Sequence, residues 1–342
     1  MIRSLILSLL FASSASASQL HVFVVTDTEH PKDAAYFSAD SEAVSSCLHE
    51  MVPTAQLNLI QIGTSDGWGK LTTELHELKV AQDDAIFVYV STHGSWTQTL
   101  RFNYLLGEEV IERAELIRAI RLKDCRLGIL ISDACASIPG DVDYKRRNLT
   151  RTYAPHFLTQ PKPLAQKLFF DSRGFVDIIS SQKGESSYFY LQDGGAGSLF
   201  TNCLVEKLSE SKDQTLSWGQ IYAAVKTDSS REYKRLKELY PKAYPQKSVT
   251  PFAFGLDTPD GRNKFSFGFS IVDGEPAGAR VTKIQPGFPA AQAGLQVDDI
   301  ILSMNGKKFT IAQQLGKMLH SSSTPCTFEV LRDGQRMTIR VE

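Results

Sequence analysis

The chain has little cysteine and almost no net charge, and the apolar run at its N-terminus, like its other apolar runs, is too short to cross a membrane. Its five cysteines have spacings that match no zinc motif. The 37 Lys and Arg residues balance the 38 Asp and Glu residues, which excludes the basic surface typical of nucleic-acid-binding proteins. We therefore expect no nucleic-acid partner, no bound metal and no cofactor.

The short apolar run is at the N-terminus. Leu5 to Phe11 follows the basic Arg3 and is too short to span a bilayer. Small residues follow, with Ala15 and Ala17 in an Ala-x-Ala pattern. This order is typical of a secretory signal peptide. We predict a signal peptide over residues 1–18, a secreted or periplasmic location, and no integral membrane segment after signal cleavage.

An exported protein can oxidise its cysteines in pairs, and five is an odd number, so at least one thiol is left over. Cys47, Cys125 and Cys203 lie in predicted helices or at strand edges, where buried structural thiols are expected. We interpret Cys135 as the remaining thiol, for the reasons below.

Residues 19–254 alternate predicted strands and helices, and the strands are apolar throughout. This pattern is typical of a doubly wound, mostly parallel sheet with both faces covered by helices. The predicted strands are 20–26, 57–62, 85–91, 126–132 and 175–180, and the predicted helices are 41–51, 71–79, 114–121, 164–170, 199–208 and 218–239.

The pattern changes after this α/β domain. Residues 255–263 are rich in turn-forming residues and are predicted to be a linker. From 264 to 342 the sequence has short strand patterns with Gly and Pro turns, so we predict a second, smaller, β-rich domain.

Reactive residues follow two of the apolar strands. His93 follows the strand 85–91, and Cys135 follows the strand 126–132. Ligand sites in such sheets form at the carboxyl ends of the strands, and neighbouring strands lie about 5 Å apart. A thiol becomes a nucleophile when a nearby imidazole takes its proton. The sequence therefore predicts a His93/Cys135 dyad, with backbone N–H groups of Gly94 and Cys135 as an oxyanion hole.

Both residues also have a purely structural interpretation. Cysteine is among the most commonly buried residue types, and a His before Gly is often only a turn residue. Their joint position at two strand ends favours the catalytic interpretation.

The same region resembles caspase and metacaspase peptidases (peptidase family C14, clan CD). Caspases carry Q-A-C-[RQG]-G with a histidine about fifty residues upstream, whereas here Asp133-Ala134-Cys135 has His93 upstream by 42 positions. Further matching blocks are Tyr89-x-Ser91-x-His93-Gly94, Ser180-Ser181-Gln182-x-Gly184-Glu185 and Gly197-Ser198-Leu199-Phe200-Thr201. The resemblance covers most of residues 20–254 and implies a caspase-like fold and a cysteine-type endopeptidase acting on proteins or peptides.

The chain departs from the metacaspase pattern beside the dyad. Thr92 replaces a glycine, and Ala136 and Ser137 follow the cysteine in place of His-Ser. These departures keep open an alternative function, a catalytically weak scaffold that binds peptides. A legumain-like or clostripain-like specificity also stays open.

Asp133 is the candidate for the pocket that binds the P1 side chain, the residue before the scissile bond. Side chains two apart on a strand point the same way, so Asp133 faces the side of Cys135 if the strand continues that far. A carboxylate there suits a basic side chain, and the resemblance implies cleavage after Arg or Lys. The alternative is that Asp133 only caps the following turn. The resemblance also implies an earlier acidic residue, for which Asp40 and Glu42 both remain candidates.

Residues 141–151 are highly charged, and the resemblance implies a loop near the cleft that is a candidate for self-cleavage. The resemblance also leaves calcium activation open, with no calcium ligand named.

The C-terminal domain resembles PDZ domains. Phe267, Gly268 and Phe269 resemble the loop with which PDZ domains hold a C-terminal carboxylate, and the segments 279–295 and 297–306 extend the match. Successive backbone N–H groups can hold a carboxylate, while the peptide adds to a sheet edge. We expect peptide C-termini as partners, bound between a strand beside residues 269–271 and a helix over 310–319.

Overall fold

The computed structural model describes residues 17–96, 102–134, 158–181, 185–190, 197–246, 248–255, 267–275, 277–284, 289–320 and 325–341. The predicted signal peptide therefore lies almost wholly outside the described residues, as do Cys135 and the charged segment 141–151.

A six-stranded sheet forms the centre of the N-terminal domain. The strand order is β2-β1-β3-β7-β8-β9. The first five strands in this order pair in parallel, and β9 runs antiparallel at one edge. The strands are β1 (Leu20–Thr26), β2 (Leu57–Ile62), β3 (Ala85–Ser91), β7 (Leu127–Asp133), β8 (Gly174–Ile179) and β9 (Phe252–Gly255).

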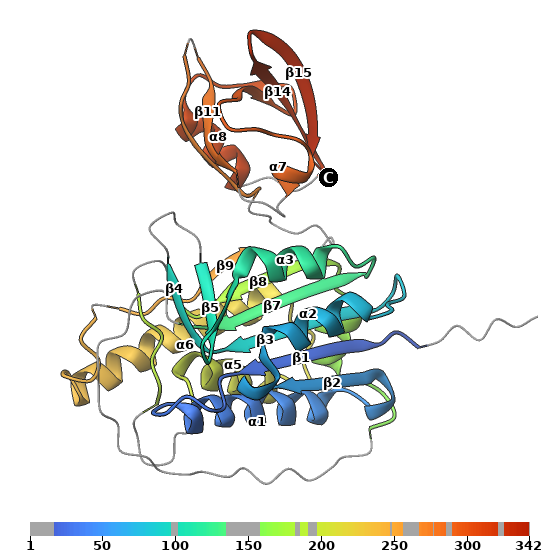
Figure 1. The fold of residues 1–342 in the computed structure, drawn as a ribbon, viewed down its shortest axis with the longest axis vertical. Coiled ribbons are helices and arrows are strands. Elements are labelled where there is room, and N and C mark those ends of the chain that lie inside the picture. Colours follow the sequence, from blue (N-terminus) through green and yellow to red (C-terminus); the bar gives the residue numbers. More distant parts are fainter. Residues whose placement is uncertain are drawn as a thin grey trace, which may run out of the picture.

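Helices cover both faces of this sheet (Figure 1). One face packs against α1, α5 and α6, and the other packs against α2 and α3. Alternate residues of each strand enter the two cores: Phe87 and Tyr89 of β3 face α1 and α5, while Val88 and Val90 face the opposite layer. Burial on both faces explains why these strands read as continuous apolar runs. The helices are α1 (Ala34–Met51), α2 (Gly67–Glu77), α3 (Arg113–Arg121), α4 (Pro163–Ala165), α5 (Leu199–Glu210) and α6 (Trp218–Leu239).

The predicted elements of this domain are present, with shifted ends. β1, β2, β3 and α6 have the predicted bounds, whereas α1 begins at Ala34 instead of residue 41. The first two turns of α1 lie outside the predicted helix, and the polar Asp40 at their end is nevertheless buried. The predicted helix 164–170 is the short α4 followed by a π-helical segment, Gln166–Asp171. Two 3₁₀ turns, Thr54–Gln56 and Thr64–Asp66, flank β2.

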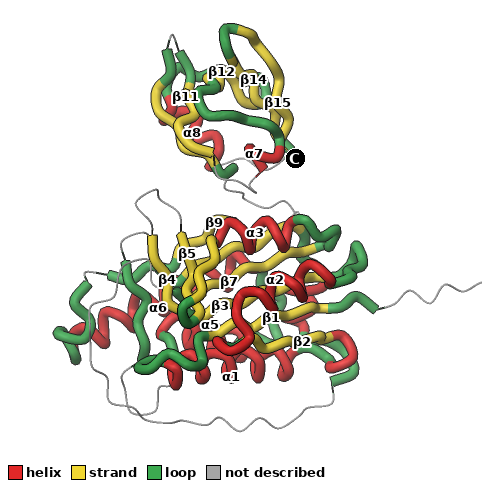
Figure 2. Tube along the Cα trace, in the orientation of Figure 1, coloured by secondary structure: helices red, strands yellow, loops and turns green. Residues whose placement is uncertain are grey.

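A second, three-stranded sheet was not predicted. It consists of β4 (His93–Trp96), β5 (Phe102–Leu106) and β6 (Glu109–Glu112), all antiparallel. β4 begins one residue after Thr92, so the chain leaves the main sheet and immediately enters this second sheet (Figure 2). Its strands are short and half-polar, which gives little pattern in sequence.

The C-terminal domain is a separate β-rich unit. Its sheet has the order β10-β11-β12-β14-β15, with the short β13 (Lys307–Lys308) paired to β12. The other strands are β10 (Phe269–Asp273), β11 (Ala279–Ile284), β12 (Ile300–Met304), β14 (Cys326–Arg332) and β15 (Gln335–Val341). The helices are α7 (Pro289–Gln292) and α8 (Ala312–His320), and they share one apolar core with the sheet. The predicted boundaries of the two domains and of the linker stay a prediction.

Within the described residues, no helix combines the length and the apolar character needed to span a bilayer. No disulfide joins the four described cysteines.

Candidate active site

The candidate site lies where β3 and β7 end side by side. Ser91, the last residue of β3, is in register with Asp133, the last residue of β7. The backbone N–H of Thr92 donates to the carbonyl oxygen of Asp133 at 3.3 Å, so the two chains stay together one residue further. His93 follows directly, and Cys135 comes two residues after Asp133. The main sheet therefore brings His93 and Asp133 to one edge, which is where ligand sites form in such sheets.

His93 is held by the segment between β1 and α1. Its Nε2 lies 3.1 Å from Oδ2 of Asp33, and its ring packs against the rings of Phe37 and His30, with centroids 5.3 and 4.4 Å away. A neutral imidazole that donates Nε2–H to this carboxylate keeps Nδ1 as an acceptor. The arrangement therefore fits a general base whose ring is oriented by Asp33, a residue that the sequence reasoning did not identify.

His30 lies on the other side of Asp33. Its Nδ1 accepts the backbone N–H of Asp33 at 3.1 Å and lies 3.2 Å from Oδ2 of the same residue. Burial, followed by the charge of His93, lowers the pKa of His30. The sequence spacing gave no metal pattern, but the fold brings His30, Asp33 and His93 together with their ligand atoms within 4.8 Å of one another.

Two buried carboxyl groups lie below the strand ends, on the side of α1 and α5. Asp133 is 2% exposed and accepts hydrogen bonds from the hydroxyl of Ser187 at 2.5 Å and from the backbone and hydroxyl of Thr201 at 3.1 and 2.7 Å. Tyr89 adds to this network through its hydroxyl, 2.5 Å from that of Thr201. The pKa of Asp133 is raised overall, because the effect of burial exceeds the opposing effect of these hydrogen bonds.

Asp40 of α1 is the second carboxyl group. It accepts the hydroxyl of Ser91 at 2.6 Å, the backbone N–H of Ser198 at 2.7 Å, and the hydroxyl of Ser198. Burial, followed by the charge of Asp133, raises the pKa of Asp40 to about 8. Asp40 and Asp133 therefore form one electrostatic unit that carries less than two full negative charges at neutral pH.

Gly197 allows this close packing. It has φ of +89°, and a Cβ atom there would collide with the Asp40 carboxylate. The block Gly197 to Thr201, which carried part of the family resemblance, thus supplies donors to both carboxyl groups. A side chain at Gly197 would push Asp40 away from Ser198.

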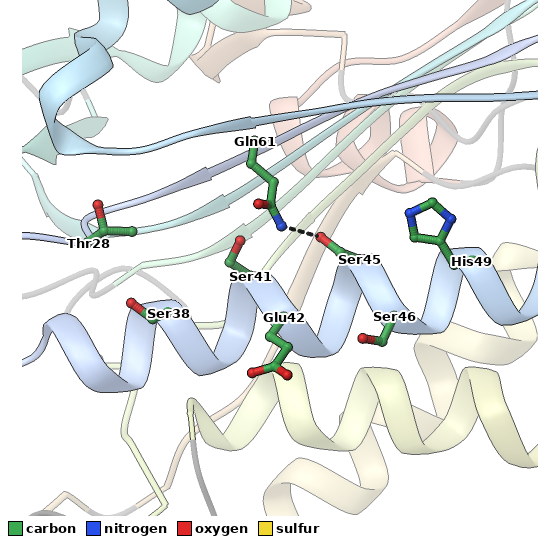
Figure 3. A pocket seen from close by; sticks show the side chains of 8 residues that line it. All are labelled: Thr28, Ser38, Ser41, Glu42, Ser45, Ser46, His49 and Gln61. Atoms are coloured by element: carbon green, nitrogen blue, oxygen red, sulfur yellow. Dashed lines mark hydrogen bonds between the residues drawn. The ribbon is translucent and has the colours of Figure 1, made fainter. Parts of the chain in front are cut away.

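A polar pocket of about 490 Å³ lies elsewhere, between α1 and β2 (Figure 3). Ser45 and Gln61 on its walls are joined by a hydrogen bond of 3.0 Å. Its lining includes Glu42, so the alternative acidic residue of the early block lies in this surface pocket, whereas Asp40 lies beside Asp133.

Comparison with known proteins identifies both domains. The model of the caspase domain matches residues 39–250, more than half of the chain. The chain belongs to the caspase family. Its N-terminal domain has the caspase-like α/β fold predicted from the sequence, and the family is one of cysteine-type endopeptidases, a class of hydrolases. The model of the PDZ domain matches residues 258–325, so a PDZ domain follows the caspase domain.

Individual relatives match part of the chain or share its outline. A probable periplasmic serine endoprotease DegP-like of Pseudomonas fluorescens is 39% identical over 69 residues, which are 20% of this chain and 14% of that protein. The 26S proteasome non-ATPase regulatory subunit 9 of Mus musculus is 42% identical over 67 residues, 18% of this chain and 30% of that protein. The chain thus spans less than a third of these relatives. Caspase-1 from Spodoptera frugiperda is similar in structure with a TM-score of 0.46 and 15% identity, covering 69% of this chain and 85% of that one.

In the caspase domain, the predicted site residues lie as follows. His93 and Asp133 are at the same strand ends, 19% and 2% exposed respectively. Gly94 lies in β4, in register with Tyr104 of β5. Cys135 lies outside the described residues, so its place in the dyad and in the oxyanion hole stays a prediction. β7 ends at Asp133, and the condition for Asp133 and Cys135 to face one side is thus also untested.

In the PDZ domain, Phe267 and Phe269 pack on Phe328 of β14, with ring centroids 5.7 and 5.8 Å apart. Gly268 between them has φ of +75°, a conformation that favours glycine. The phenylalanines thus anchor this loop in the core, and β10 begins at Phe269. The helix predicted over 310–319 is α8, and it packs near β10 and β11.

Proposed function

We propose that this caspase-family protein is an exported cysteine endopeptidase that cleaves after Arg or Lys, with His93 and Cys135 as its dyad. The observation that supports this most directly is the juxtaposition of an oriented imidazole with a buried acidic pair. His93 is held by Asp33. Asp133 ends β7 beside Ser91 at the end of β3, and Asp40 of α1 accepts the hydroxyl of Ser91.

The geometry around His93 supports the following proposed catalytic roles. With Nε2–H directed at Asp33, Nδ1 of His93 accepts the proton of the Cys135 thiol, and the thiolate attacks the scissile carbonyl carbon. The imidazolium then protonates the leaving amine. The backbone N–H groups of Gly94 and Cys135 are the proposed donors to the oxyanion.

The acidic pair supplies the proposed specificity. A guanidinium or ammonium group that enters beside Asp133 stabilises the ionised form of both carboxyl groups, which compensates for their burial. The half-buried hydroxyl of Ser187 donates a hydrogen bond to Oδ1 of Asp133. The guanidinium group of a P1 Arg would replace this hydroxyl as the donor. The extensive hydrogen bonding of Asp133 to Thr201 and Ser187 favours this role over a simple cap of the following turn.

The PDZ domain is proposed to bind the C-termini of partner or substrate peptides through Phe267, Gly268 and Phe269. The export proposal rests on residues 1–18 and gains support from the word "periplasmic" in the names of the DegP-like relatives.

The test is an assay of the purified chain without residues 1–18. It uses fluorogenic peptides that end in Arg, Lys, Asp or Asn, each beside a Cys135→Ala control, with and without calcium. We expect cleavage after Arg and Lys that the control lacks.

Other outcomes separate the alternatives. Cleavage after Asp or Asn would keep the dyad and overturn the pocket assignment. Absence of any Cys135-dependent cleavage would overturn the peptidase proposal and favour a peptide-binding scaffold, which the substitutions at Thr92, Ala136 and Ser137 motivate.

A further inference from the structure

The cluster of His30, Asp33 and His93 offers a metal site that the peptidase mechanism does not need. We propose that this cluster binds a zinc ion and that zinc binding switches the peptidase off. The inhibitory part of this inference rests on the proposed role of His93 as a general base.

The donor set suits zinc. Two imidazole nitrogens and one carboxylate oxygen are ligands that Zn²⁺ takes at about 2.0–2.2 Å, which puts neighbouring ligand atoms of a tetrahedral site roughly 3.4 Å apart. Oδ2 of Asp33 lies 3.1 Å from Nε2 of His93 and 3.2 Å from Nδ1 of His30. Two of the three distances between ligand atoms are therefore close to those of a tetrahedral zinc site, and all three atoms lie within 4.8 Å of one another.

The three ligand atoms that face one another have more lone pairs than protons between them. Nδ1 of His30 accepts the backbone N–H of Asp33, so the neutral ring has no proton there to donate to Oδ2. Nε2–H of His93 is then the donor between these three ligand atoms. A cation replaces this proton and attracts all three, after a small rotation of His30 away from the backbone N–H.

Solvent reaches the cluster from the surface. The side chains of His30, Asp33 and His93 are 29%, 12% and 19% exposed, respectively. A site with three protein ligands leaves the fourth position of a tetrahedral zinc ion to water. The cluster can thus take up and release zinc without unfolding of the domain.

Zinc binding and catalysis exclude each other at His93. A neutral imidazole that binds zinc through Nε2 carries its proton on Nδ1. Nδ1 then cannot accept the Cys135 proton, and Asp33 no longer orients the ring because its Oδ2 is a zinc ligand. Zinc at this cluster therefore removes the general base, whereas the acidic pair and the PDZ domain are untouched.

Binding is measured first, without any need for activity. The full chain with Cys135→Ala is titrated with ZnCl₂ by calorimetry and with Co²⁺ by visible absorption, so that the thiol of Cys135 cannot be a ligand. We expect one zinc ion per chain and a tetrahedral Co²⁺ spectrum. Adding His30→Gln should weaken binding by at least about tenfold, whereas the matched His49→Gln, on the far turn of α1, should leave binding unchanged.

Inhibition is measured next on the chain that keeps Cys135. Zinc should abolish peptide cleavage, a chelator should restore it, and His30→Gln should raise the zinc concentration for half inhibition by at least about tenfold. Absence of zinc binding to the Cys135→Ala chain, or equal binding with and without His30, would overturn the site. A zinc-free chain without activity would overturn the proposed peptidase, and the titration of the Cys135→Ala chain would still decide the zinc site.

Discussion

At the scale of single residues, the proposed chemistry depends on a few polar side chains near the ends of β3 and β7. Asp133 and Asp40 are almost fully buried and are held by hydroxyl and backbone donors from Ser91, Ser198 and Thr201. Three of the described thiols differ from a catalytic one, because burial raises the pKa of Cys125, of Cys203 to about 11, and of Cys326 to about 12. They are protonated at neutral pH and react slowly.

The first residue-scale prediction concerns Asp133→Asn. Removing the charge leaves a basic P1 side chain without its partner, so kcat/KM for Arg and Lys substrates should fall by at least about 30-fold, the equivalent of ~2 kcal/mol. Steady-state kinetics of P1 Arg and P1 citrulline peptides measures it, since citrulline has the same shape without charge. Labelling of Cys135 with a small alkylating agent is the control for an intact nucleophile, and an unchanged preference for Arg over citrulline would contradict the assignment.

The second residue-scale prediction concerns Asp40 and the pH dependence of the protein's stability. The pKa of Asp40 is about 8 in the folded protein, above its value in the unfolded chain, so the folded state binds the extra proton between these pH values. The contribution of Asp40 to stability is thus greatest at acidic pH and declines as the pH rises toward 8. Asp40→Asn mimics the protonated group and should flatten the loss of Tm between pH 6 and 9. Parallel thermal melts of wild type and variant would contradict this, and Asp213→Asn is the matched exposed control.

At the scale of elements, the segment that joins β1 to α1 is as important as the strands that carry the dyad. It places Asp33 against Nε2 of His93, and α1 continues with Phe37 against the same ring and Asp40 against Ser91. One connection and the helix that follows it thus contact both the proposed base and the buried acidic pair. The second sheet, β4 to β6, begins with His93 itself and fixes the backbone on its other side.

The element-scale prediction concerns Asp33→Asn. The amide can donate to Nε2 of His93, which favours the tautomer that carries its proton on Nδ1 and cannot accept from the thiol. We expect kcat to fall by roughly tenfold or more with KM nearly unchanged. Asp33→Glu should recover part of kcat, because a carboxylate is again available. Equal losses in both variants, or a change confined to KM, would show that Asp33 does not orient His93.

At the scale of the whole molecule, the proposed function assigns catalysis to one domain and peptide recognition to the other. The caspase domain and the PDZ domain have separate apolar cores. The PDZ loop is built by Phe267 and Phe269 anchored on Phe328, with Gly268 in the left-handed region. The backbone N–H groups of this loop are the proposed donors to a peptide carboxylate.

The whole-molecule prediction separates the two functions. Peptides with a free C-terminal carboxylate should bind the full chain at least about tenfold more tightly than the same peptides with a C-terminal amide, because only the carboxylate accepts from the loop. Gly268→Val should remove this difference, since φ of +75° strains a branched residue. Cleavage of short fluorogenic peptides should be the same in both proteins. Equal affinity for acid and amide forms in the wild-type chain would contradict the assignment of the loop.

Much of the fold could be predicted from the sequence because local pattern and burial agree. The strands of the main sheet are buried on both faces and thus read as apolar runs, and the PDZ match was carried by one continuous stretch. The short strands β4 to β6 and the antiparallel β9 could not be predicted, since their pairing depends on partners distant in the sequence.

The sequence by itself determined the succession of the five parallel strands and of the main helices in the N-terminal domain, the strand ends near His93 and Asp133, and membership of the caspase family. Only the tertiary structure decided that Asp40, and not Glu42, lies with Asp133, and that Asp33 and His30 lie beside His93. The physical reason is that charge and burial of these side chains depend on contacts between residues 50 to 160 positions apart, such as Ser91 and Ser198 with Asp40. No local sequence pattern reveals such contacts, whereas the spacing of apolar residues in a strand or helix is visible among neighbouring residues.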